Sequence, residues 1–544
     1  MKKLAYYIPL LFLCFCSLIA CSEKDQLEVI DKEEPEGQSP EEPVDLGNFT
    51  SDHQHNLNVI YFVPADIEPL ERYHERLSGV MLYMQDWYAQ EMARYGFDKT
   101  FGLLKSEVDP SYVKVLVIRG KNNQEYYPYE GGGSKAIQEI KEYFEQHPED
   151  NHGAHTLVFM PSREGDNGWN AGGVPFYGLG KWCFALDYKN FDMKYFGSNS
   201  KEADDHWIGG TIHELGHGLN LPHNKHKATD NWISMMAWGN HEFASAPENV
   251  RFTLADALIL NNNQIVNKNS AVTYYTQTPE FNLKAMRIYA DAQNLYVSGK
   301  FETDVPVNGV IVYNDPKTSE SDADYNAVTW GTKQIEPDNS FSLTMPLEGI
   351  DKDFQQYPFE LRIRFCHENG NFTVQKYSYQ FQSGRPDIDI HLKEVEELPK
   401  DTWSVIAVSS EELVGEGADN GAAAYLIDQD AASFWHSQWY QAKPDYPHSF
   451  TVDMGATHEV KGLVFDQRGE KYNGRVKDYT LEVSNDNTSW TKVGDFTLSD
   501  AQRIVKDLDM SQTFRYFKIT IISGYDNGSG ENVFFTHLAE IGVY

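Results

Sequence analysis

One short stretch of the chain brings three histidines and a glutamate together at spacings that suit metal binding. His213 and His217 are four positions apart, so on an α-helix they lie on one face, about one turn from each other. Glu214 is displaced around the axis and can face a metal-bound water without ligating the metal. His223 follows six residues later and can act as a third ligand if the helix ends between the two.

The residues before His223 favour such a helix end. Asn220 tolerates the left-handed conformation better than any residue except glycine, and Pro222 lacks the backbone donor that a continuing helix needs. Three imidazoles favour Zn²⁺ over the oxygen-preferring Mg²⁺ or Ca²⁺. A fourth position left open for water is typical of catalytic zinc. We therefore predict a catalytic zinc site at which Glu214 is the general base that takes a proton from the metal-bound water.

Residues 213–223 resemble the extended zinc signature of the metzincin metallopeptidases, HExxHxxGxxH, with Asn220 in the place of the usual glycine. Metzincins also have a Met-turn beneath the metal, and Ser234 and Met236 resemble its Ser-x-Met core. In some metzincins a tyrosine two residues after the methionine approaches the zinc. Trp238 stands there in this chain and cannot ligate, so that role is not carried over. The resemblance implies a metzincin-like zinc endopeptidase domain.

Residues 51–268 are expected to form the α/β (α+β) domain that positions this motif. The active-site helix should begin near Asp204 and Asp205, which are good N-cap residues. Its inward face repeats at helical spacing and consists of Ile208, Ile212, Leu215 and Leu219. In metzincins an edge strand borders the cleft, and the resemblance implies the same here. The other expected elements are strands at 57–63, 113–119 and 155–160, an edge strand within 172–188, and helices at 68–95 and 134–146.

The segment from 269 to 398 has short β-rich runs separated by turn residues, which is typical of an immunoglobulin-like antiparallel β-sandwich. No catalytic cluster stands out in it, so a spacer or packing role is expected. The strands are predicted at 295–301, 309–313, 340–345, 359–367 and 372–381.

Residues 399–544 resemble the discoidin family, the coagulation factor 5/8 type C modules, through the stretches 428–437, 450–455, 477–484 and 538–541. The family fold is a β jelly roll, and many bacterial members bind sugars. Trp435 is expected to belong to the core. The resemblance implies a glycan site formed by His436, Arg468, Asn473 and Phe534, and a structural Ca²⁺ site formed by Asp428, Asp430 and Glu540. A purely structural sandwich without a ligand is the alternative.

The N-terminus has the pattern of a secretory signal. Lys2 and Lys3 precede an apolar run that ends at Ala20, and the sequence up to Cys21 resembles a bacterial lipobox, which implies that Cys21 is lipidated. Residues 22–50 are acidic and proline-rich and are expected to form an extended linker. Their acidic start resembles that of surface lipoproteins of Bacteroidota. We expect a secreted protein that is lipid-anchored to the bacterial outer membrane and exposed on the cell surface.

Length and charge define the remaining expectations. A chain of 544 residues is too long for one core and predicts about three domains. The formal net charge of −35 argues against binding nucleic acid or anionic lipid. Membrane contact is therefore expected only through the lipid anchor, and a monomer is expected. Cys183 and Cys366 remain after the signal and the lipidated cysteine are set aside, and no disulfide is expected between them.

Two classes of function fit these observations. The first is a zinc endopeptidase that cleaves extracellular, mucin-type glycoproteins and is held on glycans by its C-terminal module. The second is a glycan-binding surface lipoprotein whose peptidase domain is inert. The complete set of three ligands and a base favours the enzyme. A glycoside hydrolase is a weaker third alternative, because no pair of carboxylates stands out.

Overall fold

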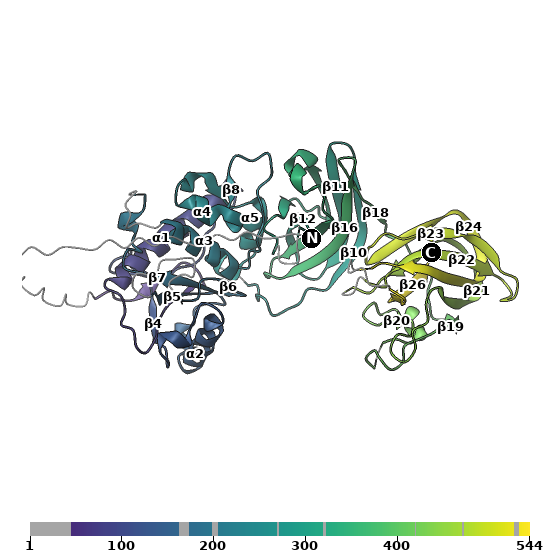
Figure 1. Ribbon diagram of the computed structural model, residues 1–544, viewed down its shortest axis with the longest axis horizontal. Coiled ribbons are helices and arrows are strands. Elements are labelled where there is room, and N and C mark those ends of the chain that lie inside the picture. The colour runs from purple at the N-terminus through teal and green to yellow at the C-terminus, as the bar shows by residue number, and fades with distance from the viewer. Residues whose placement is uncertain are drawn as a thin grey trace, which may run out of the picture. The chain divides into compact units, whose positions relative to one another are not determined.

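The computed structural model describes residues 45–162, 173–197, 205–268, 271–318, 323–418, 420–469, 473–526 and 533–544 (Figure 1). Leu46–Tyr544 form one compact unit, separate from Met1–Asp45. The predicted signal, the predicted lipidation site Cys21 and most of the predicted linker lie outside the described residues. The end of the predicted linker is folded, because β1 (Phe49–Thr50) pairs antiparallel with β3 (Lys105–Ser106). The expected boundary at residue 51 was therefore too late.

The N-terminal part of this unit is built on a five-stranded sheet in the order β4-β2-β5-β7-β6. The first four strands run parallel, and β6 is antiparallel to β7. Every residue of β2 and β5 is buried, as expected for parallel strands that are covered on both faces. The strands are β4 (Leu116–Arg119), β2 (Asn58–Val63), β5 (Thr156–Pro161), β7 (Trp182–Asp187) and β6 (Gly178–Leu179).

The predicted edge strand within 172–188 proves to be two strands. β7 lies inside the sheet, and only the two-residue β6 forms the edge. The sequence conceals this division because both strands lie in one run rich in glycine and aromatic residues. This edge of the sheet is therefore much shorter than expected.

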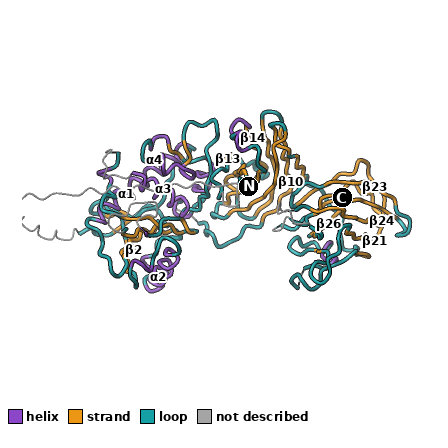
Figure 2. The backbone as a smooth tube through the Cα atoms, in the orientation of Figure 1, coloured by secondary structure: helices purple, strands orange, loops and turns teal. Residues whose placement is uncertain are grey.

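Within the described residues, the helices α1 to α5 accompany the sheet (Figure 2). The helices predicted at 68–95 and 134–146 are confirmed, although the first begins later than expected because Arg72, just before it, adopts a left-handed φ of 54°. The helices are α1 (Tyr73–Arg94), α2 (Gly132–Gln146), α3 (Asp205–Gly218), α4 (Asn240–Phe243) and α5 (Leu254–Asn261). A short parallel pair, β8 (Ile233–Ser234) and β9 (Val250–Arg251), precedes α5.

Helix α3 carries the metal motif and packs against the sheet along its predicted apolar face. Ile208, Ile212, Leu215 and Leu219 are all at most 3% exposed. Gly218 at its end lies against Cys183 of β7, whose sulfur would be 2.7 Å from any added Cβ. The amphipathic pattern of the sequence thus sets the side of the helix that faces the core.

The middle of the chain forms the expected antiparallel sandwich of two sheets, β14-β11-β10-β18 and β13-β12-β15-β16-β17. Alternate residues of β12 face different cores: Val310 and Val312 pack in the sandwich, whereas Ile311 and Tyr313 belong to the core of the α/β part. The sandwich therefore shares packing with its neighbour. Its strands are β10 (Phe281–Ala290), β11 (Asn294–Thr303), β12 (Val307–Pro316), β13 (Val328–Thr332), β14 (Ser340–Pro346), β15 (Phe359–His367), β16 (Phe372–Gln382), β17 (Arg385–Asp387) and β18 (Asp389–Leu392).

The C-terminal part is a second β-sandwich, in which the long strands β21 and β24 pair along most of their length. Trp435 is fully buried in it, as predicted from the sequence. No helix among the described residues has the length and apolar character to span a membrane. The strands are β19 (Ser404–Val408), β20 (Trp435–His436), β21 (His448–Asp466), β22 (Val476–Ser484), β23 (Thr491–Thr497), β24 (Arg503–Gly524), β25 (His537–Leu538) and β26 (Glu540–Val543).

Candidate active site

The three histidines predicted as metal ligands meet at one point. Nε2 of His217 lies 3.1 Å from Nε2 of His213 and 3.0 Å from Nε2 of His223. Zinc binds imidazole nitrogen at about 2.0–2.1 Å in tetrahedral geometry, which places neighbouring ligand atoms roughly 3.3 Å apart. Across the described residues, no other group of three or more His, Cys, Asp or Glu side chains is arranged to hold a metal ion.

Each of these rings is oriented by a backbone carbonyl at its second nitrogen. The pairs are Nδ1 of His213 with Met235 O at 2.7 Å, Nδ1 of His217 with Leu221 O at 2.8 Å, and Nδ1 of His223 with Ala323 O at 2.8 Å. A carbonyl only accepts, so Nδ1 carries the proton and Nε2 presents a lone pair. Three lone pairs that converge within 4.8 Å of one another repel unless a cation lies among them, so this donor set fits zinc.

The turn after α3 brings the third ligand back to the other two. The N–H of Leu221 donates to the Gly216 carbonyl at 3.0 Å, and Asn220 adopts a left-handed φ of 73°. This closure is the usual way for a helix to end, and it confirms the predicted role of Asn220. The same turn aims the Leu221 carbonyl at His217.

Met236 lies beneath the metal-binding residues, where the sequence predicted a Met-turn. Its sulfur would be 2.5 Å from a Cβ at Gly216, so only glycine allows this contact with α3. Met236 is fully buried within the short π-helical segment Met235–Gly239. Its carbonyl accepts from the N–H of Asn224, whose side chain accepts from the Ser234 hydroxyl. The turn is thus bonded to the residue that follows the third ligand.

Glu214 is held at the edge of the sheet. The N–H of Gly178 in β6 donates to its carboxylate, while withdrawal from water raises the pKa of Glu214 to about 8. A Cβ at Gly178 would lie 2.2 Å from the Cβ of His217, so β6 can approach α3 this closely only with glycine here. A divalent cation at the imidazoles would lower this pKa and favour the carboxylate form.

Two tyrosines interact electrostatically with this carboxylate. Glu214 raises the pKa of both Tyr129 and Tyr325, after the larger effect of burial, which indicates that both phenols lie near it. Trp238 is 58% exposed and stacks on Tyr325 with ring centroids 5.0 Å apart. Tyr325 lies between β12 and β13 of the β-sandwich, for which the sequence predicted a spacer or packing role. Its ring packs on Trp238, and no local pattern around Tyr325 could have revealed this contact.

A second polar cluster lies in the C-terminal sandwich. His436 and Arg468, two of the residues predicted to bind a glycan, approach Glu416, with nitrogen–oxygen distances of 3.9 and 4.0 Å. Trp439 donates its indole N–H to the same carboxylate at 3.0 Å. The guanidinium of Arg468 stacks over Phe434 at 3.9 Å from the ring centroid. Sequence reasoning missed Glu416 and Trp439, because single polar or aromatic loop residues carry no periodic signal.

The other two predicted glycan residues have different surroundings. Asn473 accepts a hydrogen bond at its backbone carbonyl from Nε2 of His537, at 2.9 Å. Phe534 packs edge-on against Phe535, and the Phe535 ring is the one that lies 5.2 Å from the ring of His436. The structure therefore brings His436 and Arg468 together with Glu416, and places Phe535 nearer to them than the sequence suggested for Phe534.

The residues predicted to bind calcium do not form a ligand set. Lys400 forms a buried ion pair with Glu540, so an ammonium lies where a cation was expected. The other oxygen of Glu540 accepts from the N–H of Gln429, and Glu540 also bonds to the side chain of Asp428. Asp428 and Asp430 are exposed and accept further bonds within their own turn. Calcium binding here stays a prediction, and the ion pair with Lys400 argues against it.

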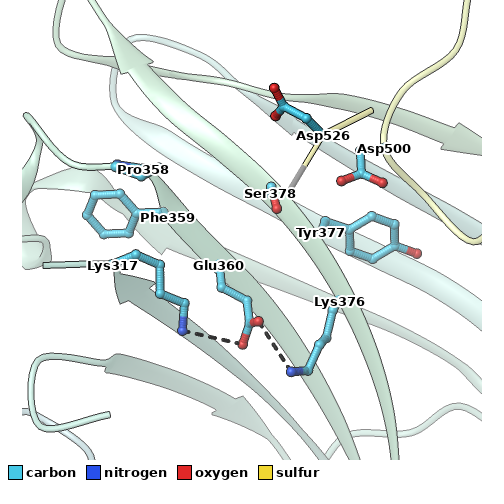
Figure 3. Close-up of a pocket in the computed structure, with 9 residues that line it drawn as sticks. All are labelled: Lys317, Pro358, Phe359, Glu360, Lys376, Tyr377, Ser378, Asp500 and Asp526. Carbon is cyan, nitrogen blue, oxygen red and sulfur yellow. Dashed lines mark hydrogen bonds and ion pairs between the residues drawn. The ribbon is translucent and has the colours of Figure 1, made fainter. Parts of the chain in front are cut away.

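A pocket elsewhere in the compact unit has a different character (Figure 3). Glu360 in this pocket receives Lys376 at 3.3 Å and Lys317 at 3.8 Å, so its charge is already compensated. None of the residues predicted to do chemistry lines it. The lining residues are Lys317, Pro358, Phe359, Glu360, Lys376, Tyr377, Ser378, Asp500 and Asp526.

Comparison with known proteins identifies a domain family and similar solved structures. The F5/8 type C domain family matches residues 405–534, which confirms the discoidin-type C-terminal module. A crystal structure of catalytically inactive OgpA from Akkermansia muciniphila, in complex with an O-glycopeptide substrate, is 32% identical, with a TM-score of 0.56. That match covers 60% of this chain and 94% of that chain. Wild-type OgpA matches at 33% identity and a TM-score of 0.55, again over 60% of this chain and 94% of that one.

Curated relatives match over a shorter part of the chain. A sialidase of Micromonospora viridifaciens is 35% identical over 131 residues, which are 23% of this chain and 19% of the sialidase. A galactose oxidase of Gibberella zeae is 28% identical over 127 residues, which are 23% of this chain and 17% of the oxidase. The chain thus spans less than a fifth of the length of these two relatives.

Proposed function

Because the chain belongs to the family of OgpA from Akkermansia muciniphila, we propose that it is a zinc-dependent endopeptidase that cleaves O-glycosylated, mucin-type proteins. One observation carries the proposal: three Nε2 lone pairs converge at 3.0–3.1 Å beside a carboxylate, and every Nδ1 is bonded to a carbonyl. This arrangement is costly to assemble without a cation. OgpA itself is described as binding an O-glycopeptide substrate.

His213, His217 and His223 would hold the zinc ion. When bound, zinc lowers the pKa of a coordinated water and polarises the scissile carbonyl. The Glu214 carboxylate takes a proton from the attacking water and delivers it to the nitrogen of the leaving amine. The Gly178 N–H holds one side of that carboxylate and so keeps it directed at the water. The Tyr325 phenol can donate a hydrogen bond to the developing oxyanion.

The aromatic rings around Glu214 support a glycosylated substrate. Tyr129, Trp238 and Tyr325 present apolar ring faces of the kind that pack against a sugar ring, and the phenol groups can bond to hydroxyls. A peptide that carries a sugar near the scissile bond would bury more apolar surface there than a bare peptide. We therefore infer that the glycan contributes to substrate binding.

We further infer that the C-terminal module binds glycans through His436, Arg468 and Glu416, which could together bond several sugar hydroxyls. Secretion and lipidation at Cys21 would place the enzyme on the outer surface of the cell. Replacing Cys21 with alanine is expected to move the protein from the membrane fraction to the soluble fraction. A membrane-bound Cys21→Ala protein would contradict the anchor.

The proposed activity is tested on the full chain with a synthetic O-glycopeptide and the same peptide without the sugar. We expect about one zinc per molecule by elemental analysis. We also expect cleavage of the glycopeptide, faster than that of the bare peptide, and loss of cleavage on adding a chelator that zinc reverses. Mass spectrometry of the fragments identifies the cleaved bond. A protein that binds glycans but neither holds zinc nor cleaves either peptide would instead be a glycan-binding lipoprotein with an inert peptidase domain.

A further inference from the structure

The third metal ligand is oriented by a residue that lies 100 positions away in the sequence. Nδ1 of His223 bonds to the carbonyl of Ala323 at 2.8 Å, whereas the carbonyl partners of the other two ligands are 22 and 4 positions away. The Tyr325 ring stacks on the His223 ring, with centroids 3.7 Å apart and planes at 24°. The orientation of His223 thus depends on the connection between β12 and β13 of the sandwich.

This connection is held in a conformation that L-residues rarely adopt. Ala323 has a φ of 44° and Asp324 a φ of 67°, and such residues persist only where the surroundings fix them. The Asp324 carboxylate receives two hydrogen bonds from the Arg362 guanidinium on β15, at 2.7 and 2.8 Å. Two parallel bonds fix both the distance and the angle. Arg362 is fixed in turn by Glu360, at 2.9 Å.

Backbone contacts, here called the seam, join the segment after His223 to the segment after Tyr325. The N–H of Lys225 donates to the carbonyl of Ala327 at 2.7 Å, and Lys225 forms a parallel bridge with Val328. The residues that follow the third ligand therefore run beside the residues that follow the strained turn. The seam sets the spacing of the two segments, and the ion pair sets the conformation of the turn between them.

We propose that the segment Ala323–Tyr325, locked by the ion pair between Asp324 and Arg362, is the positioning element for the third zinc ligand, and that this ion pair sets the zinc affinity of the enzyme. The β-sandwich then helps to fix the geometry of the metal centre by orienting His223. The inference rests on the proposed function, because it requires that the three histidines bind zinc. Hydrogen-bond partners of metal ligands typically change metal affinity about 10- to 100-fold when removed.

The test measures zinc affinity of the full chain directly, by competition between the metal-free protein and a chromophoric chelator. Arg362→Met is expected to weaken zinc binding roughly tenfold or more, because the turn loses both bonds. Asp324→Asn is expected to have an intermediate effect, since asparagine tolerates the left-handed conformation and its amide oxygen still accepts. The visible spectrum of the Co²⁺-loaded protein should change in the same order, because it reports the geometry of the ligands.

A matched control removes an equivalent ion pair elsewhere. Arg515 donates two bonds to Asp453 at 2.7 and 2.8 Å in the C-terminal sandwich, so Arg515→Met should leave zinc affinity and the Co²⁺ spectrum unchanged. If Arg362→Met does not fold, Asp324→Asn is compared with the control instead, and a smaller loss of zinc affinity is expected.

The outcomes separate the two proposals. A wild-type protein that binds zinc and cleaves the glycopeptide, with variants that bind zinc equally tightly, overturns the positioning role alone. The positioning role is also overturned if the variants only lower the melting temperature of the metal-free protein. A wild-type protein that binds no zinc overturns the proposed function and this inference together.

Discussion

The two polar clusters of this chain differ in how their side chains are held. At the candidate metal site every histidine ring is fixed by a carbonyl at Nδ1, and the Nε2 atoms converge on one point. In the C-terminal sandwich, His436 and Arg468 approach Glu416 only at 3.9 and 4.0 Å. The first cluster is organised for chemistry before any substrate arrives, whereas the second has polar groups still able to bond a hydroxyl.

The largest effect on the cleavage rate is expected from replacing Glu214, the proposed base beside the three histidines. Glu214→Gln preserves shape but cannot accept a proton, so the rate of glycopeptide cleavage should fall about 10²- to 10⁴-fold. Zinc content should stay at the wild-type level because the three imidazoles are untouched. Elemental analysis and initial rates check both statements. Undiminished cleavage by this variant would refute the role of Glu214.

The burial of the ligands predicts how zinc binding depends on pH. Burial lowers the pKa of His217 to about 4 and lowers the pKa of His213 and His223 as well. Protonation removes the lone pair that binds metal, so affinity falls only when the pH drops toward these lowered values. Zinc should therefore remain bound at pH 5.5, well below the usual histidine pKa of about 6.5. Equilibrium dialysis between pH 4 and 7 measures the midpoint, and release near pH 6.5 would contradict the prediction.

The same contrast explains what the sequence could predict. Spacings of four and six residues are local, so the ligands, Glu214 and the Asn220 turn followed from helix geometry and residue type. The apolar face of α3 followed from its periodicity. Ala323 and Tyr325 could not be found this way, because their contact with His223 depends on how β12 packs against the α/β core. The loops of the C-terminal sandwich are non-local in the same sense, so Glu416 was missed.

A smaller effect, on glycan affinity, is expected from changing the cluster around Glu416 in the C-terminal sandwich. Arg468→Met removes a charged donor, and such hydrogen bonds contribute about 1.5–3 kcal/mol, so affinity for an immobilised mucin-type glycan should fall roughly tenfold or more. Cleavage of a short soluble glycopeptide should be unchanged, because Arg468 lies in the separate cluster around Glu416. Surface plasmon resonance and a rate assay on one preparation check both, with Arg515→Met as control. Unchanged glycan binding would favour a purely structural sandwich.

Adding calcium is expected to leave the stability of the protein unchanged. The ammonium of Lys400 already compensates Glu540 inside the C-terminal sandwich, so a divalent ion would have to displace a buried charge with which the carboxylate is paired. An ion that bound only the folded state would stabilise it by about 2.7 kcal/mol at a hundredfold excess over its Kd. Calorimetric melting of the zinc-loaded protein with and without millimolar Ca²⁺ should therefore give the same transition.

The variant Lys400→Met tests the ion pair itself. It leaves Glu540 buried without its partner and should destabilise the sandwich by about 3–5 kcal/mol. If Ca²⁺ raises the melting temperature of the wild type, the ammonium does not occupy the cation's place. If Ca²⁺ stabilises Lys400→Met but not the wild type, the Lys400 ammonium compensates the charge of Glu540 in the place that a metal ion could take.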